Sequence, residues 1–179
     1  MTEGEHLSAM HPWVGERVKA ALAAWRDGAA GGETIRLVES VRPLAVQQTY
    51  YRQGRSRADG LSSFSLHQFA PALAADVAVI RAGRYVGSAA DPAWERWASC
   101  AEAEGLESGK RWVGLVDCPH VQAPEAVRVR LVQAAVGATP DGVWGPATEA
   151  AIVKAGAELR PGRGWARMTP AAWWALLRP

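Results

Sequence analysis

The sequence changes character after Gln122, and this change constrains the fold more than any other feature. Before it, segments that alternate polar and apolar residues, as strands do, are interspersed with segments whose apolar residues recur every three or four positions, as helices do. After it only helical patterns follow, at about 124–135, 147–155 and 170–177. Mixed α/β followed by all-α indicates two domains, which we place at 1–122 and 123–179.

The first part contains one long amphipathic helix and several short strands. The helix is predicted over Pro12–Asp27 from the spacing of Val14, Val18, Ala21, Leu22 and Trp25. Strands are predicted at 34–41, 76–80 and 84–86, and further helices at 44–53 and 92–104. We therefore expect an α+β fold, a small antiparallel sheet with flanking helices, followed by a small all-α module of three helices.

Composition excludes several classes of protein. With 49% hydrophobic and 21% charged residues, the 179-residue chain is typical of a folded protein. The net charge of +2 comes from scattered Lys and Arg residues, whereas a nucleic-acid site needs a basic stripe. No run approaches the roughly twenty apolar residues of a membrane span. Cys100 and Cys118 are too few for a disulfide scaffold, so we expect both to be reduced.

The nine tryptophans are the one compositional oddity. Large aromatic side chains dominate buried area, so most are predicted to lie in the core, Trp165, Trp173 and Trp174 among them. Trp112 and Trp144 are the best candidates for a flat ligand-binding surface.

Two of the four histidines are candidates for chemistry. His6 lies in a terminus expected to be mobile and His11 at a helix start, and neither is given a role. His67 and His120, together with Asp76, would supply the three nitrogen and oxygen ligands of a catalytic zinc site. On spacing alone this set is weak, because a histidine in a chain of this size is more often structural than metal-binding. Asp117, three residues before His120, could act as a base beside such a site.

The contexts of these residues resemble motifs of a zinc peptidase family that includes D-alanyl-D-alanine carboxypeptidases and phage L-alanyl-D-glutamate endopeptidases. Ser65-Leu66-His67 resembles the family's S-x-H, Ala75-Asp76 its A-x-D or A-A-D, and Asp117–His120 its D/E-x-x-H. Upstream, 42–55 (RPLAVQQTYYRQGR) is similar to the family's R-x4-Q-x2-L-Y-x-Q-G-R. Because several linked motifs occur in the family's order, the resemblance is fairly specific.

The resemblance implies a role for each matching residue. His67, Asp76 and His120 would bind one zinc ion, Asp117 would be the general base, and Arg42 would stabilise the oxyanion of the tetrahedral intermediate. A guanidinium suits that last task because it stays charged and presents several donors; the alternative for Arg42 is a surface ion pair. Gln47 and Arg55 would shape the site, and Ser65 would bind a ligand or turn the loop. Cys118, next to Pro119 and without an orienting partner, is expected to be a packed thiol rather than a nucleophile.

One departure from the family concerns the gap between His67 and Asp76. It holds eight residues, where the family more often has a shorter gap with a glycine after the histidine; here Gln68–Ala72 replaces that segment. A longer loop can still return Asp76 to the metal but can change the substrate pocket.

The C-terminal part resembles the small three-helix peptidoglycan-binding domain. The matching residues are Leu131, Gln133, Asp141, Gly142, Trp144, Gly145 and Thr148. Asp-Gly favours a tight turn and Thr148 falls in the first turn of a helix, so most of this motif is expected to hold the fold. The module as a whole would bind the wall.

Together the two resemblances predict a hydrolase of peptidoglycan stem peptides, of the phage endolysin type and more specifically an L-alanyl-D-glutamate endopeptidase. D-alanyl-D-alanine carboxypeptidase activity is the alternative, and a non-catalytic wall-binding or virion structural protein is another. A hedgehog-type signalling domain would share the fold and metal, but the wall-binding module disfavours it.

The acidic N-terminus lacks the order of a secretory signal. We therefore expect a monomer that is made in the host cytoplasm and reaches the wall after release, or is carried on a phage particle.

Overall fold

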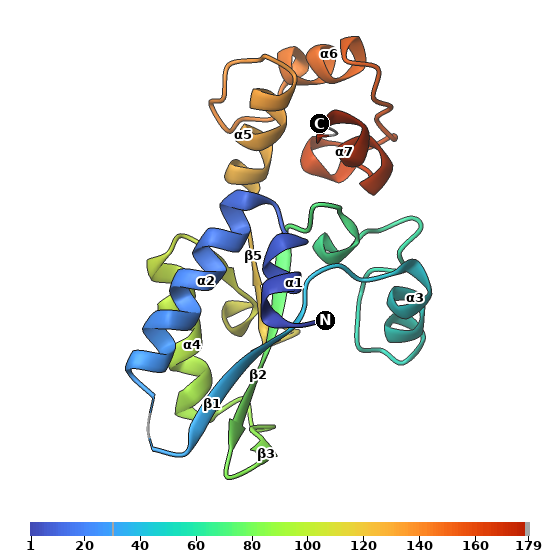
Figure 1. The fold of residues 1–179 in the computed structure, drawn as a ribbon. Coiled ribbons are helices and arrows are strands. Elements are labelled where there is room, and N and C mark those ends of the chain that lie inside the picture. Colours follow the sequence, from blue (N-terminus) through green and yellow to red (C-terminus); the bar gives the residue numbers. More distant parts are fainter. Residues whose placement is uncertain (30, 178–179) are drawn as a thin grey trace. The chain divides into compact units, whose positions relative to one another are not determined.

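The computed structural model describes residues 1–29 and 31–177, and its contacts divide the chain into two compact units (Figure 1). The first comprises Met1–Val41 with Ala72–Ala123. The second comprises Arg42–Pro71 with the chain from Pro124 onward. The predicted domains, 1–122 and 123–179, the latter including two residues outside the described range, were defined by sequence character; their separate functions stay a prediction.

The first unit is built on a small antiparallel sheet. Its strands are β1 (Glu33–Glu39), β2 (Ala74–Arg81), β3 (Arg84–Tyr85), β4 (Glu107–Ser108) and β5 (His120–Gln122). They run in the order β1-β2-β5-β4, with β3 paired to β2, and every pairing is antiparallel. In β1, Ile35 and Leu37 are buried between exposed neighbours, which is the alternation that the sequence showed.

Two helices pack against one another beside this sheet, α2 (Pro12–Asp27) and α4 (Pro92–Ala103) (Figure 1). Each begins with a proline in its first turn, where the missing N–H is no loss, and Asp91 accepts a hydrogen bond from Ala93 N at the start of α4. Trp25, Trp94 and Trp97 are buried between these elements. Each indole N–H donates to a backbone carbonyl, so no donor is left without a partner on burial.

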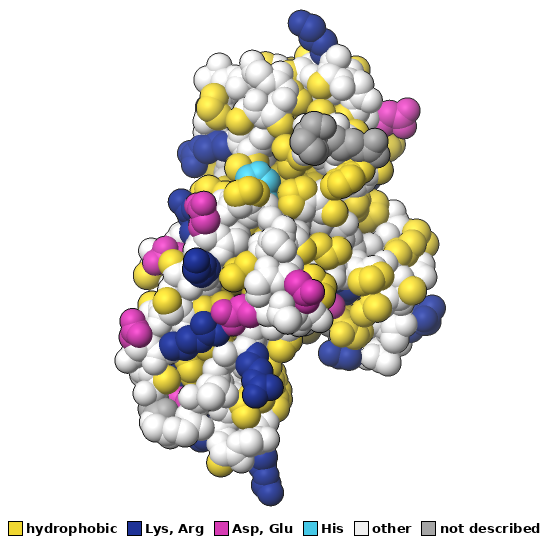
Figure 2. All heavy atoms as spheres, in the orientation of Figure 1, with side chains coloured by type: hydrophobic (Ala, Val, Ile, Leu, Met, Phe, Trp, Pro, Cys, Tyr) yellow, Lys and Arg dark blue, Asp and Glu magenta, His cyan; other side chains and the backbone are white. Residues whose placement is uncertain are grey.

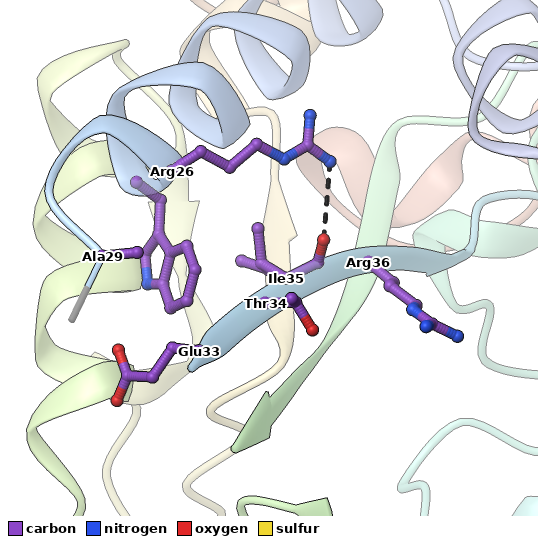
Figure 3. A pocket seen from close by; sticks show the side chains of 7 residues that line it. Arg26, Ala29, Glu33, Thr34, Ile35 and Arg36 are labelled. Carbon is purple, nitrogen blue, oxygen red and sulfur yellow. Dashed lines mark hydrogen bonds between the residues drawn. The ribbon is translucent and has the colours of Figure 1, made fainter. Parts of the chain in front are cut away.

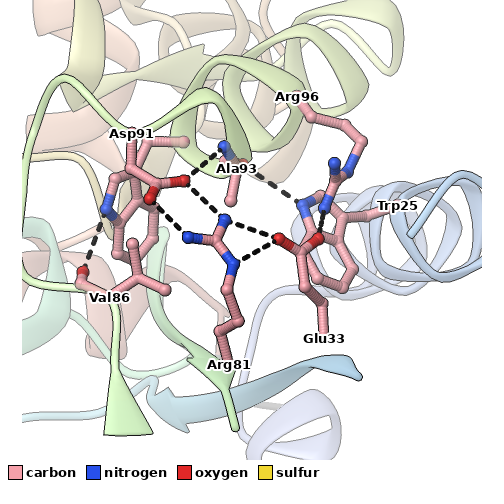
Figure 4. A network of polar contacts seen from close by, with 8 residues as sticks. Trp25, Glu33, Arg81, Val86, Asp91, Ala93 and Arg96 are labelled. Atoms are coloured by element: carbon pink, nitrogen blue, oxygen red, sulfur yellow. Dashed lines mark hydrogen bonds and ion pairs between the residues drawn. The ribbon is translucent and has the colours of Figure 1, made fainter. Parts of the chain in front are cut away.

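An ion-pair network ties the far end of β2 to α4 (Figure 4). The Arg81 guanidinium donates to Asp91 at 2.7 and 2.8 Å and to Glu33 at 2.6 and 2.9 Å. Arg96 donates to the other oxygen of Glu33. The paired guanidinium lowers the pKa of Asp91 to about 2. Because its arginines and carboxylates are mutually paired, this network is assigned to structure.

The second unit is mainly helical. It contains α3 (Leu44–Arg52), α5 (Glu125–Ala135), α6 (Pro146–Lys154), α7 (Pro170–Leu177) and short 3-10 turns at Leu66–Gln68 and Gly164–Arg167. Its apolar centre includes the rings of Phe69, Trp165 and Trp173, all buried. Trp174, expected in the core, is instead 43% exposed.

The predicted fold class is confirmed: the structure is α+β, with a small antiparallel sheet and flanking helices. The N-terminus differs from expectation, because Glu3–Ser8 forms α1, capped by Thr2. His6 lies on this helix, buried, with Nδ1 3.0 Å from Ser40 Oγ, so it is not part of a mobile terminus.

None of the described helices is long and apolar enough to cross a bilayer. Figure 2 shows basic and acidic side chains interspersed on the visible face.

Candidate metal centre

Asp76 and His120 are brought together by the pairing of β2 with β5. They are direct partners in the antiparallel register, so their side chains leave the same face of the sheet. His120 Nδ1 lies 3.0 Å from Asp76 Oδ1. Close by, the register of β1 against β2 shifts at Val38, next to the Glu39–Asp76 pair. Such bulges re-aim strands and are common beside functional sites.

His67 is held by a 3-10 turn rather than by a strand. Ser65 Oγ accepts from His67 N at 3.4 Å. Ser65 and Gln68 also form a capping box, in which Gln68 Oε1 accepts from Ser65 N at 3.0 Å. Ser65 therefore turns the loop, one of its two predicted roles. The backbone oxygen of His67 accepts from Arg42 N at 2.7 Å. The imidazole is completely buried.

His67, Asp76 and His120 form a group that could hold a metal ion. One ligand atom from each lies within 4.8 Å of the others. The donor chemistry fits zinc, which takes imidazole nitrogen and carboxylate oxygen. The 3.0 Å between Asp76 and His120 is close to the roughly 3.3 Å between ligand atoms around tetrahedral zinc. Within the described part of the chain this is the one such group of His, Cys, Asp and Glu side chains.

The other nitrogen of His120 is fixed by a relay that the sequence did not reveal. Glu107 and Gln122 are partners across β4 and β5, and Gln122 Nε2 donates to Glu107 Oε2 at 2.8 Å. A carboxylate only accepts, so the amide oxygen of Gln122 must face the other way, towards His120 Nε2 at 3.1 Å. Nε2 therefore carries a hydrogen, and Nδ1 faces Asp76, as an N–H donor when the ring is protonated and as a lone pair for a metal ion when it is not.

This tautomer makes the space between Nδ1 and Asp76 a place for a cation. Two acceptor atoms facing each other at 3.0 Å repel unless a positive charge lies between them. Burial disfavours the imidazolium, but the hydrogen bond to Asp76 and the charges of Asp76 and Asp117 outweigh burial and raise the pKa of His120. In the metal-free protein the positive charge between Nδ1 and Asp76 is a proton, and a metal ion that binds there must displace this proton.

Asp117 is positioned by a closed loop that begins at Gly109. Asp117 N donates to Gly109 O at 3.0 Å, and His120 N donates to Asp117 O at 3.2 Å. A Cβ at position 109 would lie 2.5 Å from Asp117 O and 3.1 Å from His120 Cβ, so only glycine fits. The half-buried carboxylate is near enough to His120 to act on its pKa.

Arg42 belongs to a cluster that explains the upstream motif. Its side chain is buried and donates to Gln47 Oε1 at 3.0 Å. Gln47, fully buried on α3, in turn donates to Ser56 Oγ and Ala58 O at 2.8 and 2.6 Å. The Tyr50 ring lies 4.8 Å from the Arg42 guanidinium and 4.0 Å from that of Arg55. The motif residues thus orient Arg42, which is buried rather than on the surface, and its role stays a prediction.

The surroundings of two other candidate residues, Cys118 and Trp112, bear on their predicted roles. Burial raises the pKa of the Cys118 thiol, which favours an unreactive thiol. Trp112, half-buried, lies with its ring centre 4.9 Å from that of His120, which makes it a wall of the candidate site. Its predicted role as a ligand surface stays a prediction.

A separate hollow of about 290 Å³ lies at the opposite end of β2 from Asp76. It is lined by Trp25, Arg26, Ala29 and the first residues of β1 (Figure 3). Arg26 donates to Ile35 O at 3.4 Å and is paired with Glu3, while Glu33 belongs to the Arg81 network. Because Arg26 and Glu33 are already paired, we assign the hollow no chemical role.

The sequence matches no protein-family model and no curated protein. Among solved structures, it is similar to the L-Ala D-Glu endopeptidase ChiX of Serratia marcescens. The TM-score is 0.53 with 21% sequence identity, over 70% of this chain and 89% of that one. At this identity the likeness shows a shared fold. It is in keeping with the α+β architecture and leaves the chemistry to be argued from the residues.

Proposed function

We propose that this protein is a zinc metallopeptidase that hydrolyses peptidoglycan stem peptides, as an L-alanyl-D-glutamate endopeptidase. The observation that carries the proposal is the convergence of His67, Asp76 and His120 within 4.8 Å. The fold shared with an L-Ala D-Glu endopeptidase supports it. So does the resemblance of 65–67, 75–76 and 117–120 to the motifs of the zinc peptidase family.

In the proposed reaction each residue has one task. Bound zinc would lower the pKa of its water towards neutrality, so that hydroxide is available for attack on a peptide carbonyl. The Asp117 carboxylate accepts the proton of the attacking water and returns it to the leaving amine. Arg42, oriented by Gln47, donates to the carbonyl oxygen as negative charge develops there.

We also propose that the helical part after Ala123 binds the wall. The support is the resemblance to the peptidoglycan-binding domain, whose motif residues here form a cluster centred on buried Gln133: its amide donates to Asp141 at 2.7 Å and Thr148 at 2.9 Å. These are the residues of the peptidoglycan-binding motif, and their contacts hold its turn. A role in phage lysis stays a prediction.

Mass spectrometry of digested peptidoglycan tests the proposal, together with zinc content by elemental analysis. Wild type should hold one zinc and release new L-alanine carboxyl ends paired with new D-glutamate amino ends. Asp117→Ala should keep zinc and lose cleavage by about a thousandfold, within the usual range for a general base. Cleavage at the wild-type rate would remove Asp117 from its role. Release of free D-alanine alone would assign the carboxypeptidase reaction instead, and zinc-free, inactive wild type would leave a wall-binding protein.

A further inference from the structure

The stretch that follows His67 packs into the C-terminal helices. Phe69, two residues after His67, is 1% exposed. Its ring centre lies 5.7 Å from that of Trp165 and 6.1 Å from that of Trp173, and the two indoles are 5.8 Å apart. These three rings form what we call the aromatic anchor, which belongs to one compact unit of the chain.

A hydrogen bond between Trp173 and Pro71, two residues after Phe69, reinforces the aromatic anchor. Trp173 Nε1 on α7 donates to Pro71 O at 3.0 Å, and Trp173 is fully buried. Further upstream, the Arg160 guanidinium donates to Ser62 O and lies 5.0 Å from the Phe64 ring. The loop from Ser62 to Pro71 is therefore held on both sides of His67 by residues from the last third of the chain.

Local contacts alone give His67 limited order. Its 3-10 turn is three residues long and is capped by Ser65, and such short turns have no stability of their own. Metal affinity falls with the fraction of molecules in which a ligand is correctly placed, because the apparent dissociation constant is the intrinsic one divided by that fraction. Contacts that order the loop therefore raise metal affinity without touching the metal.

We propose that Phe69 and Trp173 are positioning residues that hold His67 in its metal-binding place, so that the C-terminal helices complete the metal centre as well as binding the wall. The inference rests on the proposed function, since it presumes that His67 binds zinc. It also accounts for the unusual Gln68–Ala72 segment, because this segment supplies Phe69, a ring of the aromatic anchor, and Pro71, whose carbonyl accepts from Trp173.

The first test measures zinc affinity of the full-length chain by competition with a chromophoric chelator. Trp173→Phe keeps a ring but removes the N–H that Pro71 O accepts, and should weaken zinc binding about fivefold, as expected for one ordering hydrogen bond. Trp144 packs edge-on against Trp165, with ring centres 6.3 Å apart. Trp144→Phe is the matched control because it keeps a ring at that position and removes an indole hydrogen bond of 2.8 Å to Glu149, which is not part of the loop from Ser62 to Pro71. It should leave zinc affinity unchanged. Should Trp173→Phe fail to fold, Phe69→Leu tests the same anchor and should weaken zinc binding similarly.

The second test uses the reciprocity of linked equilibria, which a purely structural role would not show. If the aromatic anchor orders His67, zinc must in turn stabilise the anchor. Adding zinc to wild type should slow hydrogen exchange of the Trp173 indole N–H about fivefold by the same reciprocity, and leave that of Trp144 unchanged.

The outcomes separate the two proposals. Wild type that binds no zinc would overturn the proposed function. Wild type that binds zinc, with equal affinity in folded Trp173→Phe and Phe69→Leu and unchanged indole exchange, would overturn the positioning role alone. A loss of affinity in Trp144→Phe equal to that in Trp173→Phe would also overturn it, because the effect would then reflect general loosening of the helices.

Discussion

Gln133 and His120 are both buried and both sit at the centre of a polar cluster, yet the two clusters are built on opposite chemistry. Around Gln133, donors meet acceptors: its amide hydrogens face Asp141, Val143 O and Thr148, and its oxygen accepts from Gly142 N at 2.9 Å. Around His120, Nδ1 faces Asp76 Oδ1 at 3.0 Å, and this contact is favourable only with a positive charge between the two atoms. The first cluster consists of matched donors and acceptors, whereas the second needs a proton or a metal ion.

The difference teaches how to separate a fold-holding motif from a functional one when both consist of buried polar residues. A cluster whose partners satisfy one another stabilises the fold and has nothing to offer a ligand. A cluster whose acceptors converge is unfavourable until a positive charge enters. Substitutions in the two clusters should therefore have separable effects, on stability in one and on metal binding in the other.

The largest expected effect is on metal binding. Asp76→Ala or His120→Ala should weaken zinc binding by more than about a hundredfold, beyond the range caused by outer-shell partners, and should abolish cleavage. Zinc stoichiometry after dialysis and the chelator competition measure it. Gln133→Ala is the control and should keep its zinc. If Gln133→Ala lost zinc as completely as His120→Ala, the division between the clusters would be wrong.

The next effect is on stability. Gln133→Ala leaves Asp141, Thr148 and Gly142 N without their shared partner, and should lower the free energy of unfolding by about 3 kcal/mol, the sum of several buried hydrogen bonds. Urea unfolding followed by tryptophan fluorescence measures it. Gln48→Ala, a half-buried glutamine on α3, serves as control. A shift in Gln133→Ala no greater than the control's would contradict a structural role.

A smaller effect tests the relay behind His120. Gln122→Met keeps the side-chain length but removes the oxygen that faces Nε2, and should weaken zinc binding about tenfold, as expected for an outer-shell partner. Glu107→Gln keeps Gln122 in place and should have less effect. Nitrogen NMR of the imidazole in the zinc-bound protein checks the tautomer directly. A hydrogen found on Nδ1, or unaltered affinity in Gln122→Met, would refute the relay.

The smallest effect concerns how the stability of the metal-free protein depends on pH, for which the two clusters should have opposite signs. Bonds from Val143 N and Gln133 lower the pKa of Asp141, so its stabilising contribution is present above about pH 4 and is lost as the pH falls. The pKa of His120 is raised instead, so its contribution is present below its ordinary value of 6.5 and is lost as the pH rises through the higher folded value. Thermal unfolding of Asp141→Asn should flatten the acid side of the stability profile, and that of His120→Gln the neutral side. If both variants changed the pH profile of stability in the same way, the predicted difference between Asp141 and His120 would be wrong.

Local patterns predicted the elements well where packing agrees with periodicity. Helix α7 occupies the predicted range 170–177, and helix α2 occupies the predicted range 12–27. Each begins with a proline and has apolar residues that are buried on folding. Helix α1 escaped prediction since its six residues show less than two turns of pattern, and its capping box, Thr2 with Glu5, was the signal that could have revealed it.

The candidate site was predictable only in part. The motifs name His67, Asp76 and His120, but nothing local indicates that Gln122 and Glu107 stand behind His120, because that depends on which residues face each other across β4 and β5. Gly109 likewise reads as an ordinary turn glycine until its neighbours are known. The packing of 42–71 with the C-terminal helices is a long-range contact that sequence character alone, with its change near residue 123, does not predict.

The pairing of β2 with β5 also bears on how such a chain can change by insertion and deletion. Asp76 and His120 are 44 positions apart, and the residues between them can vary in number without moving either ligand, provided both strands keep their alignment. One residue added between His120 and Val121 in β5 would turn the imidazole to the other face of the sheet. Length variation among related chains should therefore collect in the connecting segments and avoid β2 and β5, the two strands whose alignment sets the distance between Asp76 and His120.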